Sequence, residues 1–433
     1  MLTQPSYTLS NRLNSIIKWA FFAMVAVYLI DCFTPLRLHY DSVRYYAIKD
    51  CIEFGCPPDS AAANDYFPYG YTILLLILSK LGILKSFSIV LINSAFLLSS
   101  LYFLYKVFEG TIPKYLFFFV IMINWLFVKF VTHPLSEMQY LFFSLASVLY
   151  YYRFIQQKKI GFLLLSIFLA WLAFMTRTVG VSLVGALAVG LLWEYRVQQI
   201  AFFKKNKFLV IGILGGIAAA LIIFSKPLGI NHYANVLSEH FKEAPFFKRV
   251  GWRFKEWGEL FINTPSNKVI DKLTNTNKFA GEASWLAFVA VGFIIFCWFV
   301  YKVYFHKNNI PFFIKAYILF YCIIMFNWPF NDPRFWVPIM PIIAAVVLQA
   351  LFANDNKILK RLSTVLLIVY IALGVFASGY MIYTSLNKKV FARTQAKGTY
   401  RSEYEIHFYG KPLSDTVTSP PDTAVINLLK RYD

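Results

Sequence analysis

Long apolar runs, separated by short polar segments, follow one another along almost the whole chain. A helix that crosses the hydrocarbon core of a bilayer needs roughly 20 apolar residues. Stretches near this length predict about eleven transmembrane helices, at residues 16–34, 87–107, 114–131, 135–152, 160–176, 178–194, 208–225, 284–304, 311–327, 336–352 and 362–383. We therefore expect an all-α polytopic membrane protein.

One further apolar stretch is too short to be counted with these. Residues 72–84 end between Lys80 and Lys85, and a stretch of this length is typical of an interfacial or re-entrant helix. We expect a juxtamembrane helix here, inside a polar first outer loop, 35–86, that is rich in acids and tyrosines.

The composition also indicates a membrane protein. Hydrophobic residues make up 58% of the 433 residues and charged residues only 15%, whereas soluble domains carry about 25% charged residues. The net charge of +20 comes mainly from basic residues in short loops. This is the positive-inside bias of membrane proteins, so no nucleic-acid partner is expected. The first apolar run follows Arg12 and Lys18 without a small-residue cleavage site, which predicts a first span rather than a signal peptide.

The basic loops predict the orientation. With 72–84 outside the membrane and the N-terminus in the cytoplasm, most basic loops fall on the inner side, and the short outer loops hold only Lys129, Arg177 and Arg334. We expect the inner membrane of a bacterium, with the active site outside. The chain then divides into a transmembrane catalytic module and a short outer tail: residues 1–383, with outer loops 35–86 and 226–283, and residues 384–433.

The second long outer loop contains the stretch KRVGWRFKEWGELF. Apolar residues recur in it at helical spacing, opposite basic ones: Val250, Phe254, Trp257 and Phe261. This pattern predicts an amphipathic helix lying at the outer interface. A plain lid or spacer loop remains an alternative.

Ionisable and polar residues gather at the outer ends of the apolar runs. Such groups at the edge of the hydrocarbon are costly and are functional candidates by default. They come from four separate loops: Asp41 and Arg44; His133, Ser136 and Glu137; Arg177; and Asp332 and Arg334. Structural roles remain open for each. Asp41 would suit a helix N-cap, and Glu137 would suit the first turn of a helix. Arg177 and Arg334 would suit anchors of helix ends at the lipid headgroups. His133 would suit a turn.

Motif absences narrow the chemistry. The chain has no HxxxH, HExxH or acidic triplet, so no protein-held metal is expected, and it has neither GxxxxGK[ST] nor GxSxG. Cys51 and Cys56 lack zinc spacing, and they would form a local disulfide if their loop faces an oxidising compartment. A carboxylate near arginines and aromatic rings suits group transfer from a lipid phosphate: the acid takes a proton from an acceptor hydroxyl, and an arginine stabilises the leaving phosphate.

The first outer loop resembles that of the GT-C superfamily of polyprenyl-phosphate-sugar-dependent glycosyltransferases. It is similar in style to bacterial relatives of protein O-mannosyltransferases and aminoarabinose lipid A transferases. Asp41-Ser42-Val43-Arg44-Tyr45-Tyr46 matches the family's Asp followed by an aromatic pair. Gly55 and Phe67-Pro68-Tyr69-Gly70-Tyr71 match its glycine turn and Tyr-Pro-Pro-Gly-Tyr-like stretch, with Tyr69 in place of the second proline.

The resemblance implies an inverting glycosyltransferase that moves a sugar from a polyprenyl-phosphate donor to a hydroxyl of a lipid, glycan or protein acceptor. It implies no cofactor and no metal. Asp41 would be the catalytic base, and we add Glu137 as a second catalytic candidate. Contacts to the donor phosphate or substrate are expected from the remaining candidates: Arg44, Tyr45, Tyr69, His133, Arg177, Asp332 and Arg334.

Two other functions remain open. A polysaccharide polymerase or ligase of the O-antigen type would place the chemistry in loop 226–283 and make Asp41 dispensable. A flippase or transporter of lipid-linked sugars would require ionisable or broken helices near the middle of the membrane, and the centres of the predicted spans are nearly free of ionisable residues.

Overall fold

A computed structural model describes residues 10–196, 238, 239, 241, 244–306, 308–352, 357–394, 399–413 and 420–433. In these residues all regular structure is helical, which confirms the all-α prediction for this part of the chain. The α-helices are α1 (Asn11–Asp31), α2 (Tyr40–Phe54), α3 (Tyr69–Lys80), α4 (Ser86–Val107), α5 (Lys114–Met122), α6 (Trp125–Phe130), α7 (Glu137–Gln157), α8 (Ile160–Thr176), α9 (Val181–Glu194), α13 (Phe246–Ile262), α14 (Ser266–Thr276), α15 (Lys278–Val300), α16 (Phe312–Asn327), α17 (Met340–Phe352), α18 (Lys357–Leu386), α19 (Lys388–Thr394), α20 (Arg401–Tyr409) and α21 (Thr423–Tyr432). Three short helices complete the set: η1 (Thr178–Gly180), the π-helix η2 (Tyr301–Phe305) and η3 (Pro333–Trp336).

Four of the described helices are long and apolar enough to cross a membrane: Asn11–Asp31, Ser86–Val107, Lys278–Phe305 and Arg361–Leu386. Other apolar helices are shorter: Tyr69–Lys80, Ile160–Thr176, Thr178–Glu194, Phe312–Asn327 and Met340–Phe352. Large apolar side chains such as Trp19, Trp171 and Phe376 are exposed on these helices, as expected of surfaces that contact lipid. The protein thus has helices suited to a membrane. The full set of eleven spans stays a prediction, and the span expected at 208–225 lies outside the described residues.

The stretch 114–131 differs from the single helix expected there, because it forms two helices, α5 and α6. The chain breaks at Asn124, whose side chain accepts a hydrogen bond from Leu126 N (3.1 Å) and so caps α6. The same side chain donates to Leu260 O (3.0 Å) and to Tyr370 Oη (2.9 Å). A buried amide with partners on α13 and α18 outweighs the continuous apolar pattern.

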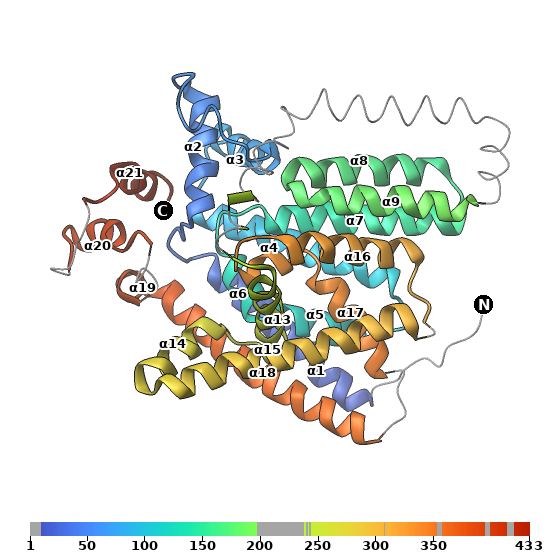
Figure 1. Ribbon diagram of the computed structural model, residues 1–433. Helices are drawn as coiled ribbons and strands as arrows, with labels where there is room; N and C mark the ends of the chain where they lie inside the picture. Colours follow the sequence, from blue (N-terminus) through green and yellow to red (C-terminus); the bar gives the residue numbers. More distant parts are fainter. Residues whose placement is uncertain are drawn as a thin grey trace.

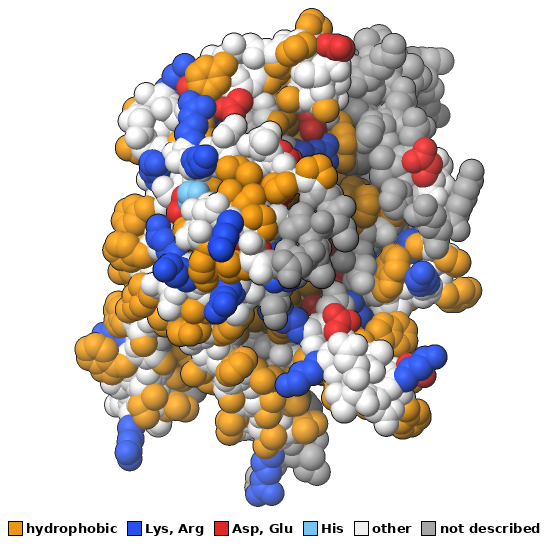
Figure 2. Space-filling model, turned by 90° about the vertical axis from the view of Figure 1, so that its left-hand side faces the viewer, with side chains coloured by type: hydrophobic (Ala, Val, Ile, Leu, Met, Phe, Trp, Pro, Cys, Tyr) orange, Lys and Arg blue, Asp and Glu red, His pale blue; other side chains and the backbone are white. Residues whose placement is uncertain are grey.

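The helices form a bundle with a smaller group at one end (Figure 1). In the bundle α7 packs against both α4 and α8, α9 packs against α16, and α13 packs against α15. Helices α2, α3 and α19 to α21 gather at one end, on the left of Figure 1. Figure 2 looks onto that end and shows basic, acidic and apolar side chains interspersed. The polar segment that begins with α2 is therefore held at the tip of the bundle.

Helix α13 is the amphipathic helix expected in the second long loop, and most of its length from Arg249 on is packed against other parts of the protein. Its apolar face is buried at Trp257 and Leu260. It crosses α15 at a point where only glycine fits, because a Cβ on Gly292 would lie 1.8 Å from Phe254 O. Its polar face is also buried, since it finds charged and polar partners in other parts of the chain.

The C-terminal tail packs onto the first outer loop. The ring of Tyr432 stacks on Tyr46 of α2, with centroids 5.0 Å apart. Tyr404 Oη donates to Leu36 O (2.7 Å) and accepts from Leu38 N (2.7 Å), just before α2 begins. At the other end of α2 the structure joins Cys51 to Cys56 in a disulfide. The tail, the loop and the disulfide together fix α2 in place.

Candidate functional site

The N-terminus of α2 directs the carboxylate of Asp41. His39 is the N-cap: its Nδ1 accepts from Asp41 N (3.4 Å), and its backbone N–H donates to Ser42 Oγ (3.1 Å). This reciprocal pair satisfies backbone donors of the first turn, which is the usual task of a capping side chain. The Asp41 carboxylate is therefore not needed as a cap, and it points toward Arg334.

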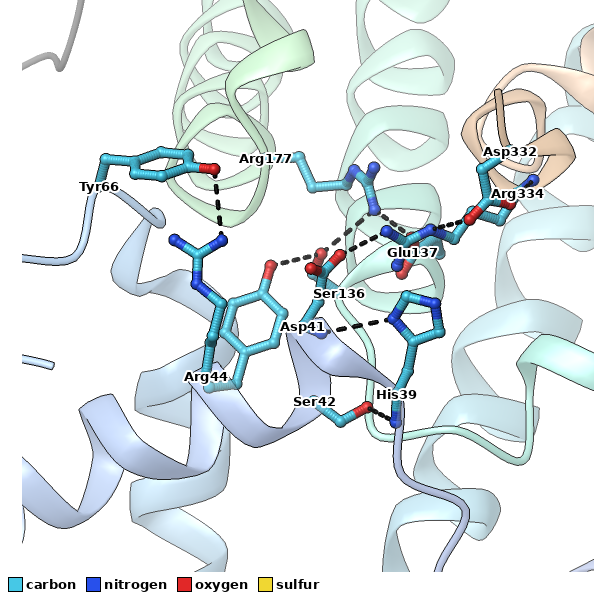
Figure 3. A network of polar contacts seen from close by, with 11 residues as sticks. His39, Asp41, Ser42, Arg44, Tyr66, Ser136, Glu137, Arg177, Asp332 and Arg334 are labelled. Carbon is cyan, nitrogen blue, oxygen red and sulfur yellow. Dashed lines mark hydrogen bonds and ion pairs between the residues drawn. The ribbon is translucent and has the colours of Figure 1, made fainter. Parts of the chain in front are cut away.

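Two arginines and three carboxylates from four segments form one cluster (Figure 3). Arg334 Nη2 donates to Asp41 Oδ2 (2.5 Å), and Arg334 Nε lies 2.8 Å from Asp332 Oδ2. Arg334 Nη1 lies 3.7 Å from Glu137 Oε1, the oxygen that also pairs with Arg177 Nη1. Glu137 thus lies between the two guanidinium groups and holds both.

The members of the cluster differ in access to solvent. The side chain of Glu137 is 1% exposed and that of Arg334 is 7% exposed, whereas 25% of the Asp41 side chain is accessible. Arg177 and Arg334 are turned into the protein, unlike arginines that anchor a helix end at lipid headgroups. Among the acids, Asp41 and Asp332 are accessible, with 25% and 26% of their side chains exposed, and both line the cavity. Glu137 lies behind the arginines, so it can orient the groups that meet a ligand.

Charge and burial compete at Asp41 and its neighbours. Burial would raise the pKa of Asp41, but the positive charge of Arg334, assisted by His39 and Arg177, holds this pKa below its usual value. Burial and the charge of Arg334 lower the pKa of His39. At neutral pH we therefore expect an ionised Asp41 and an uncharged His39.

The cluster opens into a cavity of about 680 Å³. Segments far apart in the sequence line it, among them residues 39–41, 66–68, 177–179 and 330–332. The charged residues of the cluster that line it are Asp41, Arg177, Asp332 and Arg334. The rest is largely apolar or aromatic: Tyr45, Phe67, Val179, Val181, Tyr321, Ile324, Met325, Trp328, Phe330 and Phe335. Such a cavity can take a ligand that combines an anionic group with apolar surface.

Arg44 and Tyr45 line the cavity but are already engaged. Arg44 makes two hydrogen bonds of 2.8 Å to Asp65, and its Cζ lies 3.7 Å from the ring centroid of Phe67. Tyr45 Oη donates to Ser136 Oγ (2.9 Å), to which Arg177 Nη1 also donates (3.4 Å). Arg44 therefore holds the loop that forms one wall, and Tyr45 connects that wall to the arginine cluster.

Tyr69 and His133, also expected at the site, do not line the cavity. Tyr69 begins α3 and is 47% exposed. The ring Nδ1 of His133 lies 2.9 Å from Lys129 O, and the His133 carbonyl accepts from Asn93 Nδ2 (3.0 Å). His133 thus holds the turn between α6 and α7.

Several residues that line or support the site were not predicted from the sequence. His39 stands two positions before Asp41, where a capping side chain is a recognisable signal. Tyr321 donates to Phe335 O from the middle of an apolar run. Trp328 and Phe330 look like ordinary residues of a span end. Among the described residues no group of three or more His, Cys, Asp or Glu side chains is arranged to hold a metal ion.

Comparison with known proteins finds no relative from which a function can be transferred. No protein-family model matches the chain, and neither a curated protein nor a solved structure shows significant similarity to it.

Proposed function

We propose that the protein is an inverting glycosyltransferase of the GT-C type, which transfers a sugar from a polyprenyl-phosphate donor to a hydroxyl of a lipid, glycan or protein acceptor at the outer face of a bacterial cell membrane. One observation carries the proposal. An accessible carboxylate, Asp41, shares a cavity with two inward-facing arginines, Arg177 and Arg334, and with an extensive apolar wall.

Asp41 acts as the general base. As the acceptor oxygen attacks the anomeric carbon, its proton passes to an Asp41 carboxylate oxygen. The new carbon–oxygen bond forms while the bond from the anomeric carbon to the phosphate oxygen breaks, and polyprenyl phosphate leaves with that electron pair. A single displacement inverts the anomeric centre. A positioned general base typically contributes about 10²- to 10⁴-fold to the rate.

Arg177 and Arg334 bind the phosphate and stabilise the charge that develops on it. Guanidinium groups are permanently charged and bind phosphate oxygens with two donors. Glu137 keeps both arginines directed to one place, so we assign it a positioning role and leave proton transfer to Asp41. When Arg334 engages the phosphate, the hydrogen bond that it now donates to Asp41 is released, and the carboxylate becomes free to accept a proton.

The remaining candidates support binding. The apolar wall, including Val181, Ile324 and Met325, suits the first isoprene units of the lipid. The rings of Tyr45 and Phe67, whose centroids lie 5.0 Å apart, offer faces to the sugar, and Arg44 holds the Phe67 ring in place. Asp332 keeps Arg334 oriented. Tyr69 and His133 do not line the cavity, so we assign neither of them a substrate contact; His133 holds the α6–α7 turn.

The polymerase or ligase hypothesis places the chemistry in loop 226–283. In the described part of that loop α13 carries buried charges, but none of its residues lines the cavity. The accessible carboxylates of the cavity, Asp41 and Asp332, come from the first outer loop and from segment 328–336, outside loop 226–283, which favours the transferase.

Purified protein in lipid nanodiscs, supplied with a mixture of lipid, glycan and peptide hydroxyl acceptors and incubated separately with polyprenyl-phosphate sugars and with nucleotide sugars, tests the donor class. We expect release of polyprenyl phosphate from at least one lipid-linked sugar and no turnover of nucleotide sugars. Turnover of nucleotide sugars alone would contradict the proposal. Polymerisation of a lipid-diphosphate oligosaccharide, with no turnover of monophosphate donors, would favour the polymerase.

A further inference from the structure

The segment 328–336 carries Asp332 and Arg334 into the cavity, yet its only regular structure is the four-residue helix η3. A short irregular segment needs contacts on its far side to present an arginine in one orientation. We propose that Arg253 and Glu256 of α13 are positioning residues that clamp this segment at both ends and so keep the Arg334 guanidinium directed into the cavity, beside Asp41. Their effect on turnover rests on the proposed function, whereas their effect on the geometry of Arg334 does not.

The clamp contacts the segment before and after Arg334. Arg253 Nη2 donates to Phe330 O (2.5 Å), and Trp336 Nε1 donates to Glu256 Oε2 (2.8 Å). Asn331 lies between these points. With its side-chain amide oriented so that both its oxygen and its nitrogen have a hydrogen-bond partner, the nitrogen donates to Glu256 Oε1 (3.0 Å). Asp332 and Arg334 therefore lie between two fixed ends.

The clamp is wholly buried. The side chains of Arg253 and Glu256 are both 0% exposed, and Arg253 Nη1 lies 3.1 Å from Glu256 Oε2. Replacing a buried ion pair by apolar side chains of similar size is often neutral or favourable for stability. A gain in stability is thus a weak explanation for the presence of Arg253 and Glu256 at buried positions. Their hydrogen bonds to Phe330 and Trp336 explain it better.

Helix α13 is itself a rigid support. Its glycine contact with α15 brings the two helices close together. The ring of Trp257 packs edge-on against Trp336, with centroids 5.5 Å apart. Helix α13 therefore also holds the end of the segment through an apolar contact. On the other side, Tyr321 of α16 donates to Phe335 O. The segment is held from both sides.

The decisive variant replaces the pair together, Arg253→Met with Glu256→Leu, because this change leaves no unpaired buried charge and is expected to fold. Glu256→Gln is the conservative variant, since its amide oxygen can still accept from Trp336. Arg249→Met is the matched control: Arg249 is a buried arginine one turn earlier on α13, and its Cζ lies 3.9 Å from the ring centroid of Phe241.

For turnover of a polyprenyl-phosphate sugar, the double variant should lose roughly 10- to 100-fold in kcat, with a smaller change in KM, because a misplaced catalytic group slows the chemical step. Glu256→Gln should retain most of the activity, and Arg249→Met should match wild type. A double variant that folds and turns over the donor at the wild-type rate would overturn the proposal.

A second readout needs no turnover. Carbodiimide modifies protonated carboxyl groups, and mass spectrometry can follow it at Asp41 as a function of pH. Loosening Arg334 should raise the midpoint of this profile in the double variant, but not in Arg249→Met. An unchanged midpoint in the double variant would overturn the clamp. A raised midpoint in a protein that turns over no donor would support the clamp and contradict the proposed function.

Discussion

Two groups of polar side chains, each with an aspartate and an arginine, take their aspartates from neighbouring parts of the chain, Asp31 and Asp41, but differ in what surrounds them. The closed cluster is Asp31 and Arg37 with their hydroxyl partners; the open cluster is Asp41, Glu137, Arg177, Asp332 and Arg334. In the closed cluster Asp31 is 0% and Arg37 2% exposed. Ser385 Oγ donates to Asp31 Oδ1 (3.0 Å) and accepts from Arg37 Nη2 (3.3 Å).

The difference lies in what the polar groups face. The closed cluster ties the end of α1 to the end of α18, and its residues line no part of the cavity. The open cluster contains an accessible carboxylate on the cavity wall. Similar residue types thus stabilise the fold where protein surrounds them on all sides. They are available for chemistry where one side faces a cavity. Substitutions should therefore affect stability in the closed cluster and activity in the open one.

The largest effect is expected from Arg334→Lys. Lysine keeps the positive charge but loses the planar pair of donors that can bind a phosphate while facing Asp332 and Glu137. We expect donor turnover to fall by about 10²- to 10³-fold, as for removal of a preorganised charge-stabilising donor, with a melting temperature close to that of wild type. Steady-state kinetics and thermal unfolding in the same detergent measure both. Near-normal turnover would remove Arg334 from the mechanism.

Arg37→Met should show the opposite pattern. It removes a buried cation next to Asp31 and leaves three hydroxyls, those of Thr34, Thr384 and Ser385, without its donors. The loss of one member of a buried charged group typically costs about 3 kcal/mol in the free energy of unfolding. Turnover by the folded fraction should remain within a few-fold of wild type. A stable but inactive variant would contradict the distinction between the clusters.

The pH dependence of kcat/KM should show a smaller effect, but it tests the protonation state of Asp41 directly. Because the pKa of Asp41 is held below its usual value near 3.8, its carboxylate is ionised throughout the neutral range. The stability from its pair with Arg334 is complete at neutral pH and is lost only as the pH falls below that value toward the folded-state pKa. We therefore expect kcat/KM to show no acid limb from Asp41 down to about pH 5. An acid limb near pH 6 that disappears in Asp41→Asn would show that Asp41 titrates near neutrality.

The apolar pattern predicted most helices of the described part, because burial in lipid or in a core needs only local sequence. It could not predict the break at Asn124 or the buried polar face of α13. Each depends on partners far along the chain: Leu260 and Tyr370 for Asn124, and residues 330–336 for α13.

The polar half of the candidate site was visible in the sequence, since Asp41, Arg177 and Arg334 stand where ionisable groups are expensive. The apolar half was not, because Ile324 and Met325 have the same chemistry whether they face a ligand, lipid or another helix. Asp31 and Arg37 were not singled out. Sequence alone does not distinguish them from Asp41 and Arg334, because the cavity that separates the two clusters is a property of the folded chain.

The most direct test of the central claim is single-turnover transfer of a radiolabelled sugar from its polyprenyl-phosphate donor by wild type and Asp41→Asn, with donor binding and thermal unfolding measured on the same samples. We expect the variant to fold, to bind the donor, and to transfer the sugar at least about 100-fold more slowly. A folded variant that transfers the sugar at the wild-type rate would contradict this expectation and leave Asp41 as only a structural partner of Arg334.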